Sequence, residues 1–358
     1  MRPLIDAIEA LEPGAFDDAL LARIAARGVP PRPIRFHTPS FKAYATSELA
    51  GARGSWPAVS ITGAECKLQC DHCRAKILEP MIPATTPEAL WRVANEAIAG
   101  GAQGMLLSGG SNHRDEVEYG PFLPAVRRIR DAHPGFRIAV HTALVDAAMA
   151  RDIRDAGIDV AMLDIIGAED TVRQVYHLRR PVEDFEASLA HLVDAGLDVV
   201  PHIVVGLHYG RLLGEWHALE MVARHRVKAL VLVAAMPIYA EPKRPFATPS
   251  SAEVGAFFLD ARDALGETPV LLGCARPAGR AKIETDAYAV LAGLDGIAHP
   301  ADGIVELALR AGREARVVSA CCSIGIGEDA GAPVELAMLG DAAPRARRHT
   351  LRIPLVAA

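Results

Sequence analysis

The stretch Pro57-Ala-Val-Ser-Ile-Thr-Gly-Ala-Glu-Cys-Lys-Leu-Gln-Cys-Asp-His-Cys73 joins a short apolar run to three closely spaced cysteines. These cysteines, Cys66, Cys70 and Cys73, have the spacing Cys-x3-Cys-x2-Cys. Three thiolates on one loop hold only three irons of a cubane cluster, so the fourth iron stays open for a ligand that is not protein. The stretch therefore predicts a [4Fe–4S] cluster with one exchangeable ligand.

The composition is that of a globular chain. Its 358 residues, 51% of them hydrophobic, are enough for one large core, and the net charge is −6. The nearest approach to a basic run, Arg345-Ala-Arg-Arg348, is interpreted as a solvated face, so we expect no nucleic-acid partner. We also expect no membrane partner, because no apolar run is long enough to span a bilayer, and no signal peptide, because the first residues lack an uninterrupted apolar core and a cleavage site. Six cysteines, three of them clustered, favour a reducing, cytoplasmic location.

Strand-like and helix-like segments alternate after a helical pattern over residues 3–27. The expected strands cover residues 57–62, 104–108, 137–141, 159–165, 198–205, 228–234, 269–273 and 294–298. Helices are expected near 87–99, 120–132, 145–155, 182–194, 212–225, 252–264, 281–292 and 302–311. Eight strand–helix units predict an α/β fold, a parallel (β/α)8 barrel of the TIM type.

Three regions are expected along the chain. An N-terminal helical extension covers residues 1–50, the barrel covers 51–313, and a short C-terminal extension covers 314–358. The C-terminal extension has strand patterns at 315–319 and 350–354.

The barrel prediction places the cysteine loop at the carboxyl end of the first strand, where barrel active sites lie. Ser108, Gly109 and Gly110 end the second strand, where glycines either let the backbone approach a ligand or form a tight turn. Asp164 ends the fourth strand, and its carboxylate either binds paired hydroxyls or caps a helix.

Two histidines, His202 and His208, belong to the end of the fifth strand. They either contact substrate at the barrel mouth or are satisfied core residues.

Three further cysteines lie in Gly-, Ser- and Pro-rich contexts. Cys274 follows the seventh strand, while Cys321 and Cys322 follow the last expected helix. They are either buried free thiols or the ligands of a second, auxiliary iron–sulfur cluster. Arg276 or Ser323 then completes or neighbours that incomplete ligand set.

The chain resembles the radical S-adenosylmethionine (SAM) superfamily, in its biotin-synthase-like branch. The blocks that carry the resemblance are Ile61-Thr-Gly-Ala-Glu-Cys-Lys-Leu-Gln-Cys-Asp-His-Cys73, Val172-Arg-Gln-Val-Tyr-His-Leu178 and Gly273-Cys-Ala-Arg-Pro-Ala-Gly-Arg280. The resemblance implies that SAM chelates the open iron and is cleaved by one electron to a 5′-deoxyadenosyl radical. It also implies a SAM site made of His72 near adenine, Ser108, Gly109 and Gly110 at the methionine amino group, Asp164 at the ribose, Arg180 (favoured over Arg179) at the carboxylate and Gly206 against adenine.

The cysteine distribution separates the chain from two members of that branch. Biotin synthase has cluster ligands on internal strands, but here no cysteine lies between Cys73 and Cys274. The common lipoyl synthase has an upstream cysteine motif, but residues 1–65 contain no cysteine. Phe36-His-Thr-Pro-Ser-Phe41 and Trp56-Pro-Ala-Val-Ser60 resemble the second component of the two-protein, archaeal-type lipoyl synthase system.

That resemblance implies sulfur insertion into an octanoyl chain on a carrier-protein lysine. Its implied partners are an octanoylated lipoyl-carrier protein, a companion radical SAM protein and an electron donor such as ferredoxin or flavodoxin.

Two other functions stay open. A radical SAM lyase, mutase or cluster-maturation enzyme would make 5′-deoxyadenosine without transferring sulfur, and it is favoured if Cys274, Cys321 and Cys322 lie apart. A non-catalytic zinc-binding or electron-transfer barrel fits Cys70-Asp-His-Cys73, but it leaves Cys66 and the Ser-Gly-Gly segment without a role.

Overall fold

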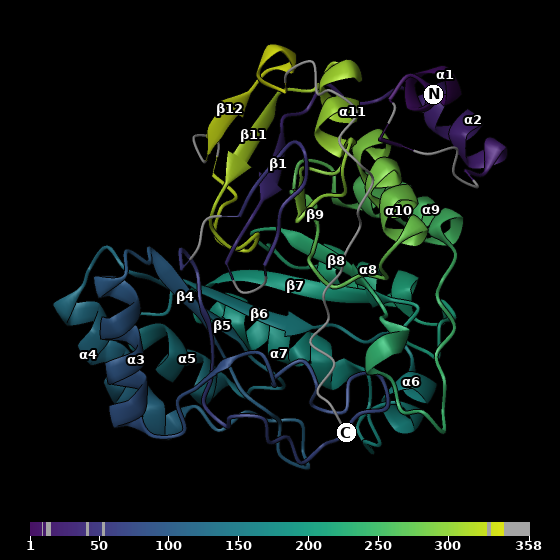
Figure 1. The fold of residues 1–358 in the computed structure, drawn as a ribbon. Coiled ribbons are helices and arrows are strands. Elements are labelled where there is room, and N and C mark those ends of the chain that lie inside the picture. Colours follow the sequence, from purple (N-terminus) through teal and green to yellow (C-terminus); the bar gives the residue numbers. More distant parts are fainter. Residues whose placement is uncertain (9, 12–15, 41–42, 52–53, 328–330, 340–358) are drawn as a thin grey trace.

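The described strands form one curled sheet of twelve strands (Figure 1). The computed structural model describes residues 1–339 except 9, 12–15, 41–42, 52–53 and 328–330. Neighbouring strands are parallel, apart from the antiparallel pair β11–β12. In the order of the sheet the strands are β12 (Ala332–Val334), β11 (Ala315–Val318), β1 (Ile34–His37), β10 (Gly296–Ala298), β9 (Val270–Leu272), β8 (Leu230–Ala234), β7 (Asp198–Val205), β6 (Val160–Asp164), β5 (Arg137–His141), β4 (Gly104–Ser108), β2 (Ala58–Ser60) and β3 (Ile82–Pro83).

All eight strands expected from the sequence are present, as β2 and β4 to β10. The helices are α1 (Arg2–Asp6), α2 (Asp18–Arg27), α3 (Pro87–Ala99), α4 (Leu123–Ala132), α5 (Ala147–Asp155), α6 (Glu169–Gln174), α7 (Glu183–Asp194), α8 (Glu215–Ala223), α9 (Ser251–Leu265), α10 (Arg280–Ala292) and α11 (Ile304–Arg310). Short 3-10 helices cover Gly120–Phe122, Pro237–Tyr239 and Leu336–Met338. The α/β, TIM-type fold class is therefore confirmed.

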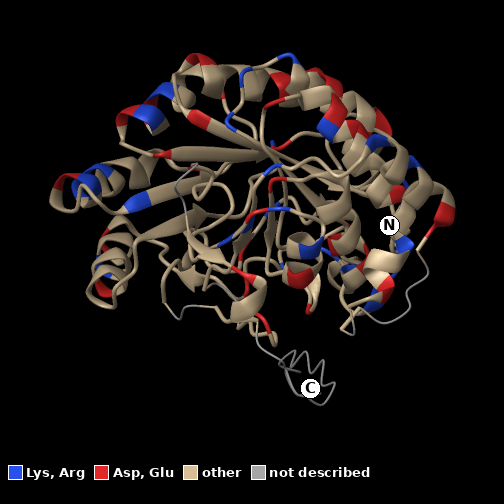
Figure 2. Cartoon of the chain, turned by 90° about the horizontal axis from the view of Figure 1, so that it is seen from above, with Lys and Arg blue, Asp and Glu red and all other residues tan. Residues whose placement is uncertain are grey.

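The sheet curls without closing into a hydrogen-bonded ring. Among the described strands, β3 and β12 occupy the two ends of the sheet and do not pair with each other. Seen from above, the helices form an arc around the strands and carry many charged residues (Figure 2). The fold is thus a half-barrel whose concave side faces inward.

The N-terminal region contributes a strand as well as helices. β1 pairs with β10 and β11, although residues 1–50 were expected to be a helical extension. The helical pattern of 3–27 is divided into α1 and α2, and Asp17 caps α2 by accepting a 2.7 Å hydrogen bond from the Leu20 N–H. The expected strand at 315–319 is β11, whereas 350–354 lies outside the described residues. The three-region division of the chain stays a prediction.

Alternate residues of the strands serve two cores. On β7, Val199 and Ile203 pack outward under the helices, while Val200 joins a separate interior core on the concave side. Trp56 fills that interior core, and a Cβ on Gly104 would lie 2.2 Å from the Trp56 ring. Because side chains alternate with a period of two, residues two positions beyond an interior residue also face the concave side.

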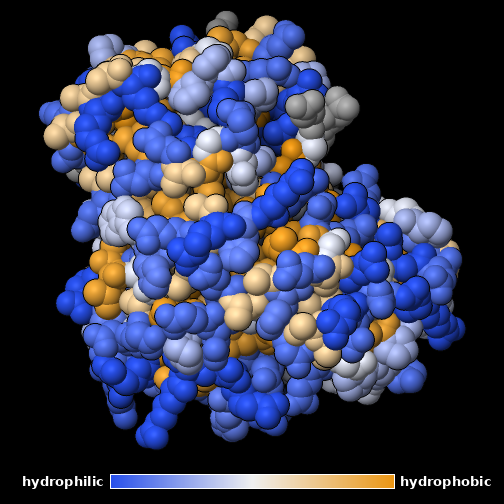
Figure 3. Space-filling view, turned by 180° about the vertical axis from the view of Figure 1, so that it is seen from behind, coloured by the Kyte–Doolittle hydropathy of each residue, from blue (hydrophilic) through white to orange (hydrophobic). Residues whose placement is uncertain are grey.

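The outer surface is predominantly polar. The face seen from behind shows hydrophilic side chains over most of its area, with hydrophobic atoms in small areas between them (Figure 3). In the part of the chain that the structure describes, no helix has the length and apolar character needed to span a bilayer.

Candidate active site

The first element of the site is the loop of residues 61–74 after β2, here called the cluster loop. It carries Cys70, which is buried, and Cys66 and Cys73, which are half-buried. The loop is fixed from below because the Lys67 N–H donates to the Ser111 carbonyl (2.9 Å). The Cys66 Sγ lies 3.7 Å from the same carbonyl oxygen. Three thiols therefore lie on one short loop, as an open-iron cubane requires.

The Ser-Gly-Gly segment after β4 is pressed against the cluster loop. A Cβ on Gly110 would lie 2.0 Å from the Glu65 carbonyl oxygen and 2.6 Å from the Cys66 Cα. The Gly110 N–H also donates to the Thr62 hydroxyl (2.7 Å). A cluster and its ligand can be approached by backbone here only because no side chain is present.

Buried polar atoms without partners lie beside the thiols. The His72 ring stands 5.1 Å from that of Tyr176, centroid to centroid. His72 Nδ1 and the Tyr176 hydroxyl are buried, and neither has a hydrogen-bond partner among the described residues. Burial, together with the charges of Asp164 and Cys70, raises the pKa of Tyr176. The three thiols, the close approach of the Gly110 backbone (here called the glycine cradle) and these unpartnered atoms fit a cluster with a polar organic ligand.

A polar rim lines the concave side where the parallel strands end. It consists of Ser60, Ser108, His141, Asp164 and His202, each at the carboxyl end of its own strand or near it. Asp164 is in register with His202, and its Oδ1 lies 3.8 Å from His141 Nε2. The rings of His141 and His202 are 5.4 Å apart. Asp164 therefore faces the mouth and caps no helix, since the N-cap of α6 is Ala168.

Asp115 is a member of the site that the sequence motifs did not indicate. It follows the Ser-Gly-Gly segment and is buried. Burial, and then the charge of Asp164, raises the pKa of Asp115 to about 6, while Ser111, His72 and Arg180 oppose the shift. A carboxyl group that titrates near neutrality in a mouth is a common feature of functional sites.

Arg180 lies at the edge of the site, where its guanidinium is paired with acidic side chains. It donates a 2.9 Å hydrogen bond to Asp184 and lies 3.6 Å from Glu116, on a cleft of about 350 Å³. Arg179 is exposed. A role for Arg180 at the SAM carboxylate, which stays a prediction, requires these ion pairs to rearrange.

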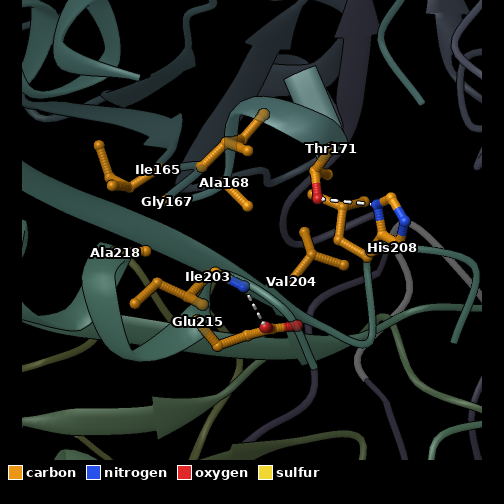
Figure 4. Close-up of a pocket in the computed structure, with 12 residues that line it drawn as sticks. Ile165, Gly167, Ala168, Thr171, Ile203, Val204, His208, Glu215 and Ala218 are labelled. Atoms are coloured by element: carbon orange, nitrogen blue, oxygen red, sulfur yellow. Dashed lines mark hydrogen bonds between the residues drawn. The ribbon is translucent and has the colours of Figure 1, made fainter. Parts of the chain in front are cut away.

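The end of β7 is held by the carboxylate of Glu215, which lies outside the mouth beside a small cavity that Thr171 and His208 also line (Figure 4). Gly206, with φ +79°, donates its N–H to Glu215 (2.8 Å), which also accepts from the N–H groups of Leu213 and Gly214. His208 is paired with the Thr171 hydroxyl (3.1 Å) beside a cavity of about 10 Å³, which has room for one water at most. His208 is thus a satisfied structural residue, whereas His202 belongs to the polar rim.

The segment after β8 that includes Glu241 and Arg244, here called the strap, contacts the cluster loop. The Glu241 N–H donates to the Asp71 carbonyl (2.8 Å), and the Glu241 carboxylate pairs with Arg74. Arg244 donates to the Asp71 carboxylate (3.0 Å). No motif in the sequence marks Asp71 as a site residue, because the residues that hold it are more than a hundred positions away.

The remaining three cysteines come together in the interior core. Cys321 and Cys322 are buried, Cys274 is half-buried, and all three pack in the same cluster as Trp56. A hydrogen bond from Cys322 lowers the pKa of the Cys321 thiol to about 7. The bond to Cys321, burial and the charge of Cys274 raise the pKa of Cys322. The three cysteines therefore lie together in one cluster, which a purely structural role would not require.

Among the described residues, neither cysteine set is arranged as a single-ion site. Within the described ranges, no three His, Cys, Asp or Glu side chains are gathered closely enough to hold one metal ion. In a cubane each thiolate binds a different iron, so the ligands stand further apart than those of one ion.

Comparisons with known proteins agree with this geometry. Residues 60–211 match the family described as the Radical SAM superfamily. No curated protein matches the chain. Among solved structures, HydG, a maturase of the [FeFe]-hydrogenase, is 16% identical with a TM-score of 0.54, over 83% of this chain and 67% of HydG. HydG from Carboxydothermus hydrogenoformans is 14% identical with a TM-score of 0.51, over 83% of this chain and 68% of its own. Methylornithine synthase (PylB) is 12% identical with a TM-score of 0.52, over 83% of this chain and 80% of PylB.

At these identities the structural neighbours show the fold alone, and the family match covers the segment from β2 to the end of β7 that carries the cluster loop. The family implies a [4Fe–4S] cluster and SAM, for which the thiols, the glycine cradle and the polar rim supply a fitting site. Residues 60–211 of the chain therefore carry a domain that matches the Radical SAM superfamily.

Proposed function

We propose that this enzyme inserts sulfur into an unactivated C–H bond of an octanoyl chain carried on a protein lysine, as a lipoyl synthase component. The observation that carries the proposal is the meeting of Cys274, Cys321 and Cys322 in the interior core, on the concave side that the polar rim also faces. Scattered thiols would have favoured a reaction without sulfur transfer.

In this proposal the residues form two sites, one for the first cluster with SAM and one for the second cluster. Cys66, Cys70 and Cys73 hold the first cluster, which supplies electrons and an open iron to SAM. Gly110 and Ser108 present backbone at the methionine end, Asp164 receives the ribose hydroxyls, and the interior thiols hold a second cluster as sulfur source.

The balance of each insertion is simple. One electron and one SAM give methionine and 5′-deoxyadenosine, whose new hydrogen comes from the octanoyl carbon. A second cluster, which Cys274, Cys321 and Cys322 would hold, would supply the sulfide for the C–S bond and would take up the remaining electron. The implied partners are an octanoylated carrier protein, a companion radical SAM protein for the second insertion and a ferredoxin- or flavodoxin-type donor, in the cytoplasm.

The test is anaerobic incubation of the reconstituted enzyme with SAM, dithionite and an octanoyl-lysyl peptide. The expected product is a peptide heavier by one sulfur, formed with 5′-deoxyadenosine in a one-to-one ratio. A Cys274→Ala/Cys321→Ala/Cys322→Ala variant is expected to keep SAM cleavage and lose the sulfur product. An unchanged peptide mass, with and without a companion enzyme, would contradict the proposal.

One observation favours a second candidate, a radical SAM lyase, mutase or maturation enzyme. The polar rim places His141, Asp164 and His202 at the mouth, and such groups suit a polar substrate better than an octanoyl chain. This candidate predicts 5′-deoxyadenosine without net sulfur transfer, and iron that is unaffected by loss of the three interior cysteines.

A further inference from the structure

His37 is the last residue of β1 and points into the interior core. It is in register with Ala298 of β10, which is a member of that core. Side chains of paired residues on neighbouring parallel strands leave the sheet on the same face. The His37 ring therefore enters the same space as Cys321 and Cys322.

The ring lies directly against the loop that carries these thiols. A Cβ on Gly325 would stand 3.0 Å from His37 Cε1 and 3.2 Å from Nδ1. The Gly325 N–H donates to the Cys321 carbonyl (3.0 Å), so Gly325 and Cys321 belong to one tight turn. On the other side, a Cβ on Gly296 would lie 3.2 Å from His37 Nε2. Glycines on both sides leave room for the ring and for no larger neighbour.

The ring nitrogens also lack well-formed hydrogen bonds within the part of the protein that the structure describes. His37 is fully buried, and neither ring nitrogen has a hydrogen-bond partner of normal geometry among the described residues, although the Ala320 backbone lies close enough to raise the pKa of the ring against the stronger effect of burial. A buried polar group that is left unpaired costs about 1–3 kcal/mol. This cost is removed if a nitrogen binds something that the interior core holds in the functional protein.

Other residues near the thiols are already engaged. Arg276 is buried and saturated, since it donates to both oxygens of Asp286 (2.6 and 3.0 Å) and to the carbonyls of Gly273 and His299. It is therefore no ligand, contrary to one alternative left open by the sequence. The Ser323 hydroxyl donates to the Cys321 Sγ (3.2 Å), so it serves a thiolate and not an iron.

We propose that His37 supplies the non-cysteine ligand of an iron–sulfur cluster held by Cys274, Cys321 and Cys322. The inference rests on the second cluster of the proposed function. Three thiolates leave one iron of a cubane without a protein ligand, and imidazole is an accepted iron ligand that raises the reduction potential of a cluster. Because imidazole is neutral, such a cluster would carry one negative charge fewer than a cluster with four thiolates. The lower negative charge suits a cluster that gives up sulfide and takes in an electron.

The test isolates the second cluster in the full-length chain. A Cys66→Ala/Cys70→Ala/Cys73→Ala background removes the first cluster, and the protein is labelled with 15N-histidine, reconstituted with 57Fe and sulfide, and reduced. Pulsed electron paramagnetic resonance is expected to show a strong coupling to one 15N nucleus, and Mössbauer spectra of the oxidised form to show one distinct iron site. Adding His37→Asn is expected to remove the nitrogen coupling and either to change the Mössbauer parameters of the distinct iron or to release that iron, since three thiolates alone also leave one iron unlike the others.

Two variants serve as controls in the same background. His299 is equally buried but lies one residue beyond interior-facing Ala298, so His299→Asn is expected to keep the coupling. Ser323→Ala is expected to keep it too. A bound cluster without nitrogen coupling, or a coupling unchanged by His37→Asn, would overturn the assignment of His37. Absence of iron in the background itself would instead overturn the second cluster and, with it, the sulfur-insertion proposal.

Discussion

The hydroxyl of Tyr209, just after β7, donates a 2.9 Å hydrogen bond to the carboxylate of Asp71, which stands between the second and third cysteines of the cluster loop. His177 Nε2 lies 2.8 Å from the other carboxylate oxygen. Together with Arg244 of the strap, these groups connect the cluster loop to three separate loops of the mouth. Asp71 is therefore a positioning residue that fixes where the cysteines stand relative to the polar rim.

Replacing this carboxylate is expected to weaken the first cluster without unfolding the barrel. In Asp71→Asn the amide can accept only part of the three hydrogen bonds, so the loop loses its fixed position. We expect SAM cleavage to slow on the order of tenfold, with faster loss of iron to a chelator. Asp170→Asn, an exposed acidic residue on α6, is the matched control and should leave both unchanged. Equal iron retention and equal 5′-deoxyadenosine formation in Asp71→Asn would contradict this role.

Gly110→Ala is expected to abolish the first cluster. The added methyl group would meet the backbone of Glu65 and Cys66, neither of which can move without displacing a ligand. We expect a folded protein with far less iron and no SAM cleavage, measured by iron analysis and circular dichroism. Gly135→Ala, where an added Cβ meets nothing within 4 Å, should behave as wild type. A fully loaded Gly110→Ala protein would show that the loop is softer than its contacts indicate.

Arg276→Met is expected to destabilise the barrel while leaving interior iron in place. Its guanidinium is paired with Asp286, and the two side chains are 1% and 0% exposed. Removing the guanidinium leaves the buried Asp286 carboxylate with the Lys282 ammonium and the Ala301 N–H, so we expect a cost of about 3 kcal/mol in the free energy of unfolding, the lower end for a broken buried pair. Arg310→Met, on the exposed face of α11, should cost less than about 1 kcal/mol. Loss of second-cluster iron from a folded Arg276→Met protein would mean that Arg276 is a ligand after all.

His202 is expected to make the protein less stable in mild acid. Burial, and then the charge of His141, lowers the pKa of His202 to about 4. In the unfolded chain a histidine titrates near 6.5, so between these values the unfolded state binds more protons and stability falls as the pH falls. From pH 7 to pH 5 this amounts to about 2 kcal/mol. In SAM-free protein, His202→Asn should reduce the difference between unfolding free energies at the two pH values, and an unchanged difference would contradict the pKa.

Local signals in the sequence predicted those elements whose neighbours are close in the chain. α3 has its expected bounds because Thr86 caps it, accepting from the Ala89 N–H at 3.1 Å, and Pro87 opens it. β5 and β7 also have their expected bounds, because each is an apolar run between clear turn residues. The cluster loop could be predicted because its three thiols lie within eight consecutive residues.

Residues whose roles depend on distant partners could not be predicted. β1 has only four residues after a Pro-rich stretch, and it is a strand because β10 and β11 lie on either side of it. His37 and Asp71 have no motif of their own. Their positions follow from pairing, packing and hydrogen bonds that join segments hundreds of residues apart, and no local pattern records such contacts.

The place of β1 in the sheet has a consequence for the order of assembly. Residues 34–37 are made long before their partners at 296–298 and 315–318. Such non-local pairing is slow, and it cannot begin until both partners have been made. The segment that holds the first cluster loop is contiguous and can mature sooner. The interior thiols and His37 can meet only after residue 322 has been made and β1 has paired, so a cluster that they share would assemble later than one on the cluster loop.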